Sequence, residues 1–135
     1  MFAALVVAAA LAVRIDDGMR ARAEVRSCVE RVLEAGGYGH LRLEGAAFIT
    51  RDGDGFGCEM WPRSVTFHST SWSGRIPANT VAIVHSHPAD IPEPSVGDAA
   101  LARRLGIPVL VVTPRGVTAA GPGASAVNFL RKFTY

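Results

Sequence analysis

The sequence predicts an α/β (α+β) domain in which helices flank a mixed β-sheet. Short runs rich in β-branched residues alternate with longer runs whose apolar residues recur at helical spacing, and turn signals rich in Gly, Pro or Asp separate them. The 135 residues suit one hydrophobic core, and 49% hydrophobic with 19% charged residues exclude a disordered chain. We expect a single domain over residues 16–135, preceded by an apolar segment at 1–15.

The apolar segment admits two interpretations. Its twelve uninterrupted apolar residues, 2–13, are too few to span a bilayer, which takes about 20, but they match the roughly 7 to 15 residue core of a secretion signal. Because no basic residue precedes the run, a core strand around residues 11–15 is the competing interpretation. We expect an exported or membrane-tethered protein, with a cytoplasmic one as the alternative.

The first half of the domain predicts one helix followed by strands. Residues 17–35 carry apolar side chains at helical spacing, and Gly36 and Gly37 end that helix. Strands are expected at 43–50, 59–61 and 65–68. The stretch from Asp52 to Gly55 predicts a hairpin turn rather than a calcium loop, because the bidentate Glu of an EF-hand does not follow it.

The second half predicts a strand, a helix and two further strands. Gly106 and Pro108 are the signals that end the helix. The tail over 121–135 ends in either a short helix or a strand. We therefore expect, in order, a buried strand over 80–84, a helix from the N-cap Ser95 to about Leu105, and strands over 108–113 and 117–120.

Chemically useful side chains gather where the strand over 80–84 ends. His85 and His87 are two residues apart in an extended run, so both imidazoles point to one face and can reach one ion, while Ser86 points away. Seven residues separate His87 from Ser95, and Asp98 then lies in the first turn of the next helix. Each half alone is an ordinary strand end or an ordinary acidic cap, but together they form a metal-ligand pattern.

This pattern, H-S-H-P followed at fixed spacing by S-x-x-D, resembles the signature of the JAMM family, also called Mov34, MPN-plus or JAB peptidases. The resemblance implies a JAB/MPN-like (cytidine deaminase-like) fold and one Zn²⁺ per chain, bound by His85, His87 and Asp98. It further implies that Ser95 supports the tetrahedral intermediate and that an upstream glutamate acts on the metal-bound water.

Two glutamates compete for that last role. In the family the glutamate opens an early strand in a pattern like E-x-x-G-x-L, and Glu44 fits this pattern except that Ala47 stands where glycine is usual. Glu59 is closer to the histidines in sequence, but its surroundings do not resemble the family pattern. We therefore expect Glu44 to be the catalytic glutamate, and a solvated surface charge is the alternative for either residue.

The predicted function is that of a zinc-dependent hydrolase, cleaving a peptide or isopeptide amide bond with a metal-activated water. Zinc supports this chemistry because it lowers the pKa of bound water to about 7 and polarises a carbonyl oxygen. By resemblance, the substrate is a protein or peptide, including the C-terminus of a ubiquitin-like protein. Two alternatives stay open: a zinc amidohydrolase acting on a small-molecule or cell-wall amide, and a catalytically inactive MPN-like binding module.

Other sites fit the sequence less well. The chain has no H-E-x-x-H motif, and neither cysteine belongs to the P-C-x-x-C element of zinc deaminases. His40 and His68 share no ligand spacing with His85, so we leave them outside the site. A net charge of +2 spread over scattered arginines forms no basic stripe, and no nucleic-acid partner is expected.

The cysteines and three aromatic residues remain open. Cys28 and Cys58 would pair in an exported protein and stay buried thiols in a cytosolic one. The aromatic residues that precede the site strand either line a substrate groove or pack in the core or at a sheet edge; they are Trp61, Phe67 and Trp72.

Overall fold

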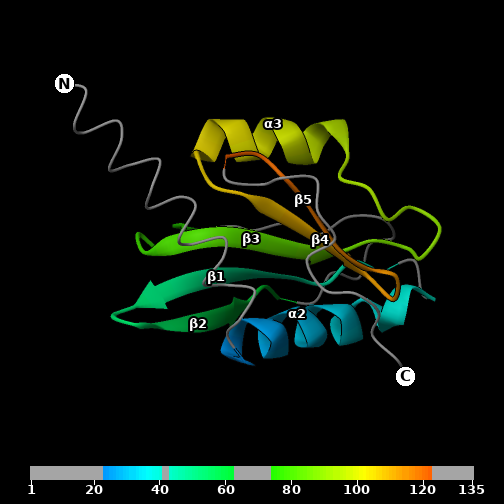
Figure 1. Ribbon diagram of the computed structural model, residues 1–135, viewed down its shortest axis with the longest axis horizontal. Coiled ribbons are helices and arrows are strands. Elements are labelled where there is room, and N and C mark those ends of the chain that lie inside the picture. Colours follow the sequence, from blue (N-terminus) through cyan, green and yellow to red (C-terminus); the bar gives the residue numbers. More distant parts are fainter. Residues whose placement is uncertain (1–22, 41–42, 63–73, 123–135) are drawn as a thin grey trace.

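The computed structural model describes residues 23–40, 43–62 and 74–122, and Figure 1 shows how their elements are arranged. In chain order these are α2 (Ala23–Ala35), the short 3-10 helix η1 (Gly37–Gly39), β1 (Ala46–Asp52), β2 (Gly55–Met60), β3 (Thr80–Ser86), α3 (Val96–Leu105), β4 (Val109–Thr113) and β5 (Gly116–Ala120). The expected mixed α/β class is confirmed for this part of the chain.

The five strands form one mixed sheet in the order β2-β1-β3-β4-β5. Neighbouring strands are antiparallel except β3 and β4, which are parallel. A parallel pair needs a crossover connection, and α3 supplies it because it lies between β3 and β4 in sequence. As a consequence, α3 begins close to the C-terminal end of β3, where the two histidines lie.

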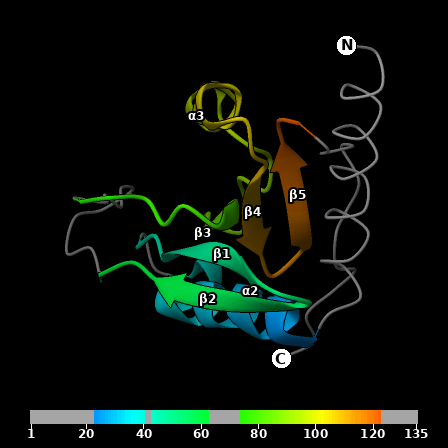
Figure 2. The same cartoon turned by 90° about the vertical axis from the view of Figure 1, so that its left-hand side faces the viewer.

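The helices α2 and α3 cover opposite faces of the sheet, as Figure 2 shows in side view. Alternate strand residues point to opposite faces, which divides the core in two. The core on the α2 side contains Val25, Val29, Val32, Ala47, Ile49, Ala82, Val84, Leu110 and Val112, among others. The smaller core on the α3 side contains Phe48, Ile83, Ala102 and Val109.

The hairpin between β1 and β2 confirms the predicted turn and corrects the strand that follows it. β1 ends at Asp52 and β2 begins at Gly55, with Gly53 at φ 58° in the turn. We predicted the second strand only over 59–61, because the glycines before it suggested a longer turn. Gly57 instead pairs with Thr50, whose side chain occupies the space that a Cβ at residue 57 would need.

The first strand also differs from its predicted bounds, since it begins at Ala46 rather than at Leu43. The Gly45 amide donates to the Ser86 side-chain oxygen at 2.9 Å rather than to a backbone carbonyl. The regular backbone pairing of β1 with β3 therefore starts at Ala46. The other described elements agree with the predictions to within two residues: α3, β3, β4 and β5.

A disulfide joins Cys28 of α2 to Cys58 of β2, with the two Cα atoms 5.5 Å apart. Of the two states that the sequence left open for these cysteines, the structure has the bonded one. The bridge holds the edge strand of the sheet against the helix that covers it.

Several predictions lie outside the described residues. These are the apolar segment at 1–15, the start of the first predicted helix at 17–22, the strand at 65–68, the tail beyond residue 122, and His68, Phe67 and Trp72. Among the helices that are described, none is long and apolar enough to cross a membrane.

Candidate metal centre

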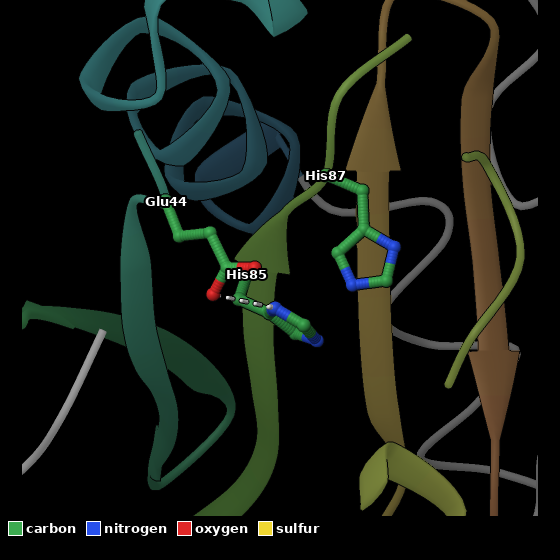
Figure 3. A group of neighbouring side chains, drawn as sticks. All are labelled: Glu44, His85 and His87. Carbon is green, nitrogen blue, oxygen red and sulfur yellow. Dashed lines mark ion pairs between the residues drawn. The ribbon is translucent and has the colours of Figure 1, made fainter. Parts of the chain in front are cut away.

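The end of β3 places His85 and His87 on the face of the sheet that α3 covers. Ile83, two residues before His85, belongs to the core on that side, and the His87 amide donates to the Val112 carbonyl at 3.1 Å, which keeps the chain extended. The two rings lie edge to face with centroids 4.7 Å apart, and both residues are buried. Figure 3 shows both imidazoles on the same side of the strand.

Ser86, between the histidines, points to the opposite face and fixes the neighbouring chain. Its Oγ accepts a hydrogen bond from the Gly45 amide, and its own amide donates to the Gly45 carbonyl, each at 2.9 Å. A Cβ at Gly45 would overlap the Val32 carbonyl, so glycine is required at this close approach. These contacts hold the adjacent Glu44 beside the histidines.

The first turn of α3 presents Asp98 to the same place. Ser95 is the N-cap and forms a capping box with Asp98. The Asp98 amide donates to Ser95 Oγ at 3.1 Å, and the Ser95 amide donates to Asp98 Oδ2 at 2.7 Å. The predicted N-cap is confirmed, and the box fixes the direction of the Asp98 carboxylate.

Asp98 approaches both histidines. Its Oδ1 lies 2.8 Å from His85 Nε2, and its Oδ2 lies 3.5 Å from His87 Nε2. His85 Nε2 is buried, and the Asp98 carboxylate faces it at this distance. Two imidazole nitrogens and a carboxylate that converge in this way are suited to share a cation.

The charge state of Asp98 is that of a ligand. Burial opposes the charged carboxylate, but the contact with His85, the charge of His85 and the hydrogen bonds from Ser95 outweigh burial and lower the pKa of Asp98 to about 2. The carboxyl group is therefore ionised at every pH at which a zinc enzyme would work.

His87 is held in the form that binds metals. Its Nδ1 lies 3.0 Å from the Ile91 carbonyl, which can only accept, so Nδ1 carries the hydrogen and the Nε2 lone pair faces Asp98. Burial, followed by the charge of His85, lowers the pKa of His87 and favours the neutral ring. The sequence did not indicate the role of Ile91, because a backbone carbonyl leaves no signal in residue type.

Glu44 joins the two histidines from the segment just before β1. Its Oε2 lies 3.9 Å from His85 Nδ1 (Figure 3), whereas Asp98 approaches Nε2 of the same ring. One ligand atom from each of Glu44, His85 and His87 can be chosen so that all lie within 4.8 Å of one another, and such a group can hold a metal ion. Glu59, the competitor, is exposed on β2 and pairs with Phe48, away from this group.

The residues present fit zinc. Two imidazoles and a carboxylate form a common three-ligand set that leaves a fourth position open for water or substrate. Here two carboxylates are available to the histidines, Glu44 at one nitrogen of His85 and Asp98 at the other.

A cavity of about 130 Å³ opens beside this group. Its polar end is formed by Glu44, His85 and Asp98, and its remaining walls are formed by Trp61, Ile83, Leu101 and Val109. Of the three aromatic residues proposed for a groove, Trp61 lines the cavity, and the other two lie outside the described residues. The aliphatic walls were not predicted, although Leu101 lies one helical turn after Asp98, a spacing that places both on one face of α3.

Comparisons of the chain with known protein families, with curated proteins and with solved structures gave no match. The function is therefore inferred from the sequence pattern and the geometry of the site.

Proposed function

We propose that this protein is a zinc-dependent hydrolase of the JAMM type that cleaves a peptide or isopeptide amide bond. The observation that carries the proposal is the convergence of His85, His87 and Asp98, with Asp98 Oδ1 2.8 Å from His85 Nε2 and Asp98 Oδ2 3.5 Å from His87 Nε2. The five-stranded mixed sheet with a helix on each face is compatible with a JAB/MPN-like fold, which we propose on the basis of the motif.

In this proposal His85, His87 and Asp98 hold one Zn²⁺. The ion, when bound, would lower the pKa of a water molecule to about 7 and polarise the amide carbonyl. Two of the three ligands already have support: the Ile91 carbonyl orients His87, and the capping box orients Asp98. The metal would therefore meet directed ligands rather than flexible surface side chains.

Glu44 would serve as the general base and then as the general acid. Its Oε2 lies 3.9 Å from His85 Nδ1, so a water molecule bound beside His85 would be within hydrogen-bond distance of the carboxylate, as a general base requires. It would take a proton from the attacking water and return it to the leaving amine, so that the amine departs neutral.

Ser95 would stabilise the negative charge that develops on the carbonyl oxygen. Its Oγ already accepts a hydrogen bond from the Asp98 amide, so its hydroxyl hydrogen remains available to donate to the substrate. Ser95 is exposed, as a group that meets substrate must be.

The disulfide supports export, with or without a membrane tether. Disulfides persist in oxidising compartments and are rare in the cytosol. The substrate would then be a protein or peptide outside the reducing cytosol. A small-molecule or cell-wall amide is the alternative substrate, and cleavage assays with both kinds of amide distinguish the two.

The decisive test is the zinc content of the purified protein by elemental analysis. We expect about one zinc per wild-type chain and loss of zinc from folded His85→Ala, His87→Ala and Asp98→Ala variants. His40→Ala, which removes an exposed histidine outside the site, should keep its zinc. Failure of the folded wild type to take up zinc would refute the hydrolase and favour a metal-free binding module.

A further inference from the structure

We infer that the cavity beside the metal centre binds an apolar side chain of the substrate next to the scissile amide, and that it selects substrates by that side chain. The inference rests on the proposed function, because it places the cleaved bond at the metal ligands. It adds a substrate class: amides flanked by a medium-sized aliphatic residue.

Continuity with the site is the first argument. Glu44, His85 and Asp98 belong both to the metal centre and to the wall of the cavity. A substrate whose carbonyl reaches these residues therefore has a neighbouring group within reach of the cavity.

The second argument is the chemistry of the walls. Apart from the polar end, all the lining residues are apolar: Trp61, Ile83, Leu101 and Val109. Among the described residues, no Lys or Arg side chain lines the cavity to pair with an anionic substrate residue. With a divalent cation bound, the charges of Glu44 and Asp98 would be balanced, so the polar end would not favour a cationic residue either. An uncharged apolar group is the occupant that leaves no charge unpaired.

The third argument is rigidity. Ile83 and Val109 are almost fully buried in the core on the α3 side, and Trp61 packs on Phe48 with ring centroids 5.2 Å apart. The Trp61 amide also donates to the Ala46 carbonyl at 2.9 Å, which ties this wall to β1. Walls anchored in the core keep their shape, and a preformed cavity discriminates between side chains by size.

The size of the cavity sets the class of side chain. An apolar cavity of about 150 Å³ admits benzene, and the 130 Å³ here includes the polar end beside the metal ligands. The apolar part therefore suits a side chain no larger than leucine and stays largely empty beside glycine. A leucine residue should therefore be preferred over glycine at least about ten-fold.

The test measures dissociation constants of the zinc-loaded protein for hydroxamates, which bind zinc without being hydrolysed. One series carries Gly, Ala, Leu or Phe side chains on the acyl side of the zinc-binding group, and a second carries them on the amine side. We expect Leu to bind at least ten-fold more tightly than Gly in one series. Leu101→Phe should fill the cavity and abolish that preference, and Leu101→Ala should move it toward Phe.

Leu105→Ala is the matched control. Leu105 packs on the same core from the same helix but does not line the cavity, so the preference should remain. Equal affinities in both series, or a Leu105→Ala variant that changes the preference as much as Leu101→Phe, would overturn the inference and leave the hydrolase standing. Conversely, selective hydroxamate binding without hydrolysis of the matching amides would refute the hydrolase alone.

Discussion

Glu44 occupies a position from which it can act on the substrate or bind the metal, and a single substitution separates the two roles. Glutamine keeps the shape of the side chain but accepts protons poorly. If Glu44 is the base, Glu44→Gln should keep about one zinc per chain and lose hydrolysis by about 10²-fold or more. Zinc analysis and amide-cleavage assays on the same preparation check both parts.

Glu59→Gln is the control for this substitution, because Glu59 is an exposed glutamate on β2 outside the ligand group. It should leave zinc content and hydrolysis unchanged. Loss of zinc from folded Glu44→Gln would instead identify Glu44 as a ligand, which its 3.9 Å distance to His85 Nδ1 also permits.

Asp98 should make the stability of the metal-free protein depend on pH in the acid range. Its pKa in the folded protein is about 2, below the ordinary 3.8, so ionised Asp98 stabilises the fold above pH 4 and loses that contribution as the pH falls toward 2. Allowing for solvent screening, we expect Asp98→Asn to cost about 1–2 kcal/mol at pH 7 and almost nothing near pH 2.

Urea unfolding of the metal-free wild type and Asp98→Asn across pH 2 to 7 tests this dependence. Asp90→Asn, which removes an exposed carboxylate from the loop before α3, serves as the control. A free-energy difference for Asp98→Asn that stays constant over the whole range would show that the His85 contact does not stabilise the ionised carboxylate.

Among the elements, α3 has an N-cap residue, Ser95, for which we propose a chemical role besides its structural one. Ser95→Ala should remove the cap and the hydroxyl together, costing about 1 kcal/mol of unfolding free energy and lowering hydrolysis by about 10²-fold. Ser95→Gly removes the same hydroxyl, but glycine is tolerated at N-caps, so its stability cost should be only a few tenths of a kcal/mol. Thermal unfolding and cleavage assays compare the two variants.

The comparison separates the two functions of Ser95. Equal loss of hydrolysis in Ser95→Ala and Ser95→Gly, despite their different stabilities, would assign the loss to the missing hydroxyl. Wild-type hydrolysis in Ser95→Gly would leave Ser95 as a helix cap alone.

Local sequence predicts some helices and strands of this fold more accurately than others. α3 and β3 were predicted closely, because an N-cap, a C-terminal glycine and a β-branched run are signals that a few adjacent residues carry. β2 was predicted too short, since its glycines resemble a turn unless the Thr50 side chain on the neighbouring strand is known. The start of β1 depends similarly on Ser86, which is distant in sequence.

At the scale of the whole molecule, the sequence indicated the polar half of the site but not the apolar half. His85, His87, Ser95 and Asp98 lie close together in sequence and follow a recognisable spacing. The cavity walls come from β3, β4, α3 and the segment after β2, and only the strand order brings these elements together. No local pattern encodes that order, so the cavity could not be predicted before the fold was known.

The disulfide joins α2 to β2, which are distant in sequence. Its removal therefore tests the stability of the whole fold. Cys28 and Cys58 are 30 residues apart in sequence, and closing a loop of that length in the unfolded chain is worth about 3–4 kcal/mol. Reduction should lower the free energy of unfolding by this amount, and Cys28→Ala/Cys58→Ala should be similarly destabilised but insensitive to reductant. Urea unfolding with and without reductant checks both.

Zinc content should survive the same treatment, because the proposed ligands lie at the C-terminal end of β3 and on α3 rather than on the elements that the bridge joins. Selectivity for leucine hydroxamate should weaken, since β2 leads directly into Trp61 at the cavity wall. Unchanged stability after complete reduction, verified by thiol titration, would show that packing of α2 on the sheet suffices without the bridge. The disulfide would then contribute nothing measurable to the free energy of unfolding.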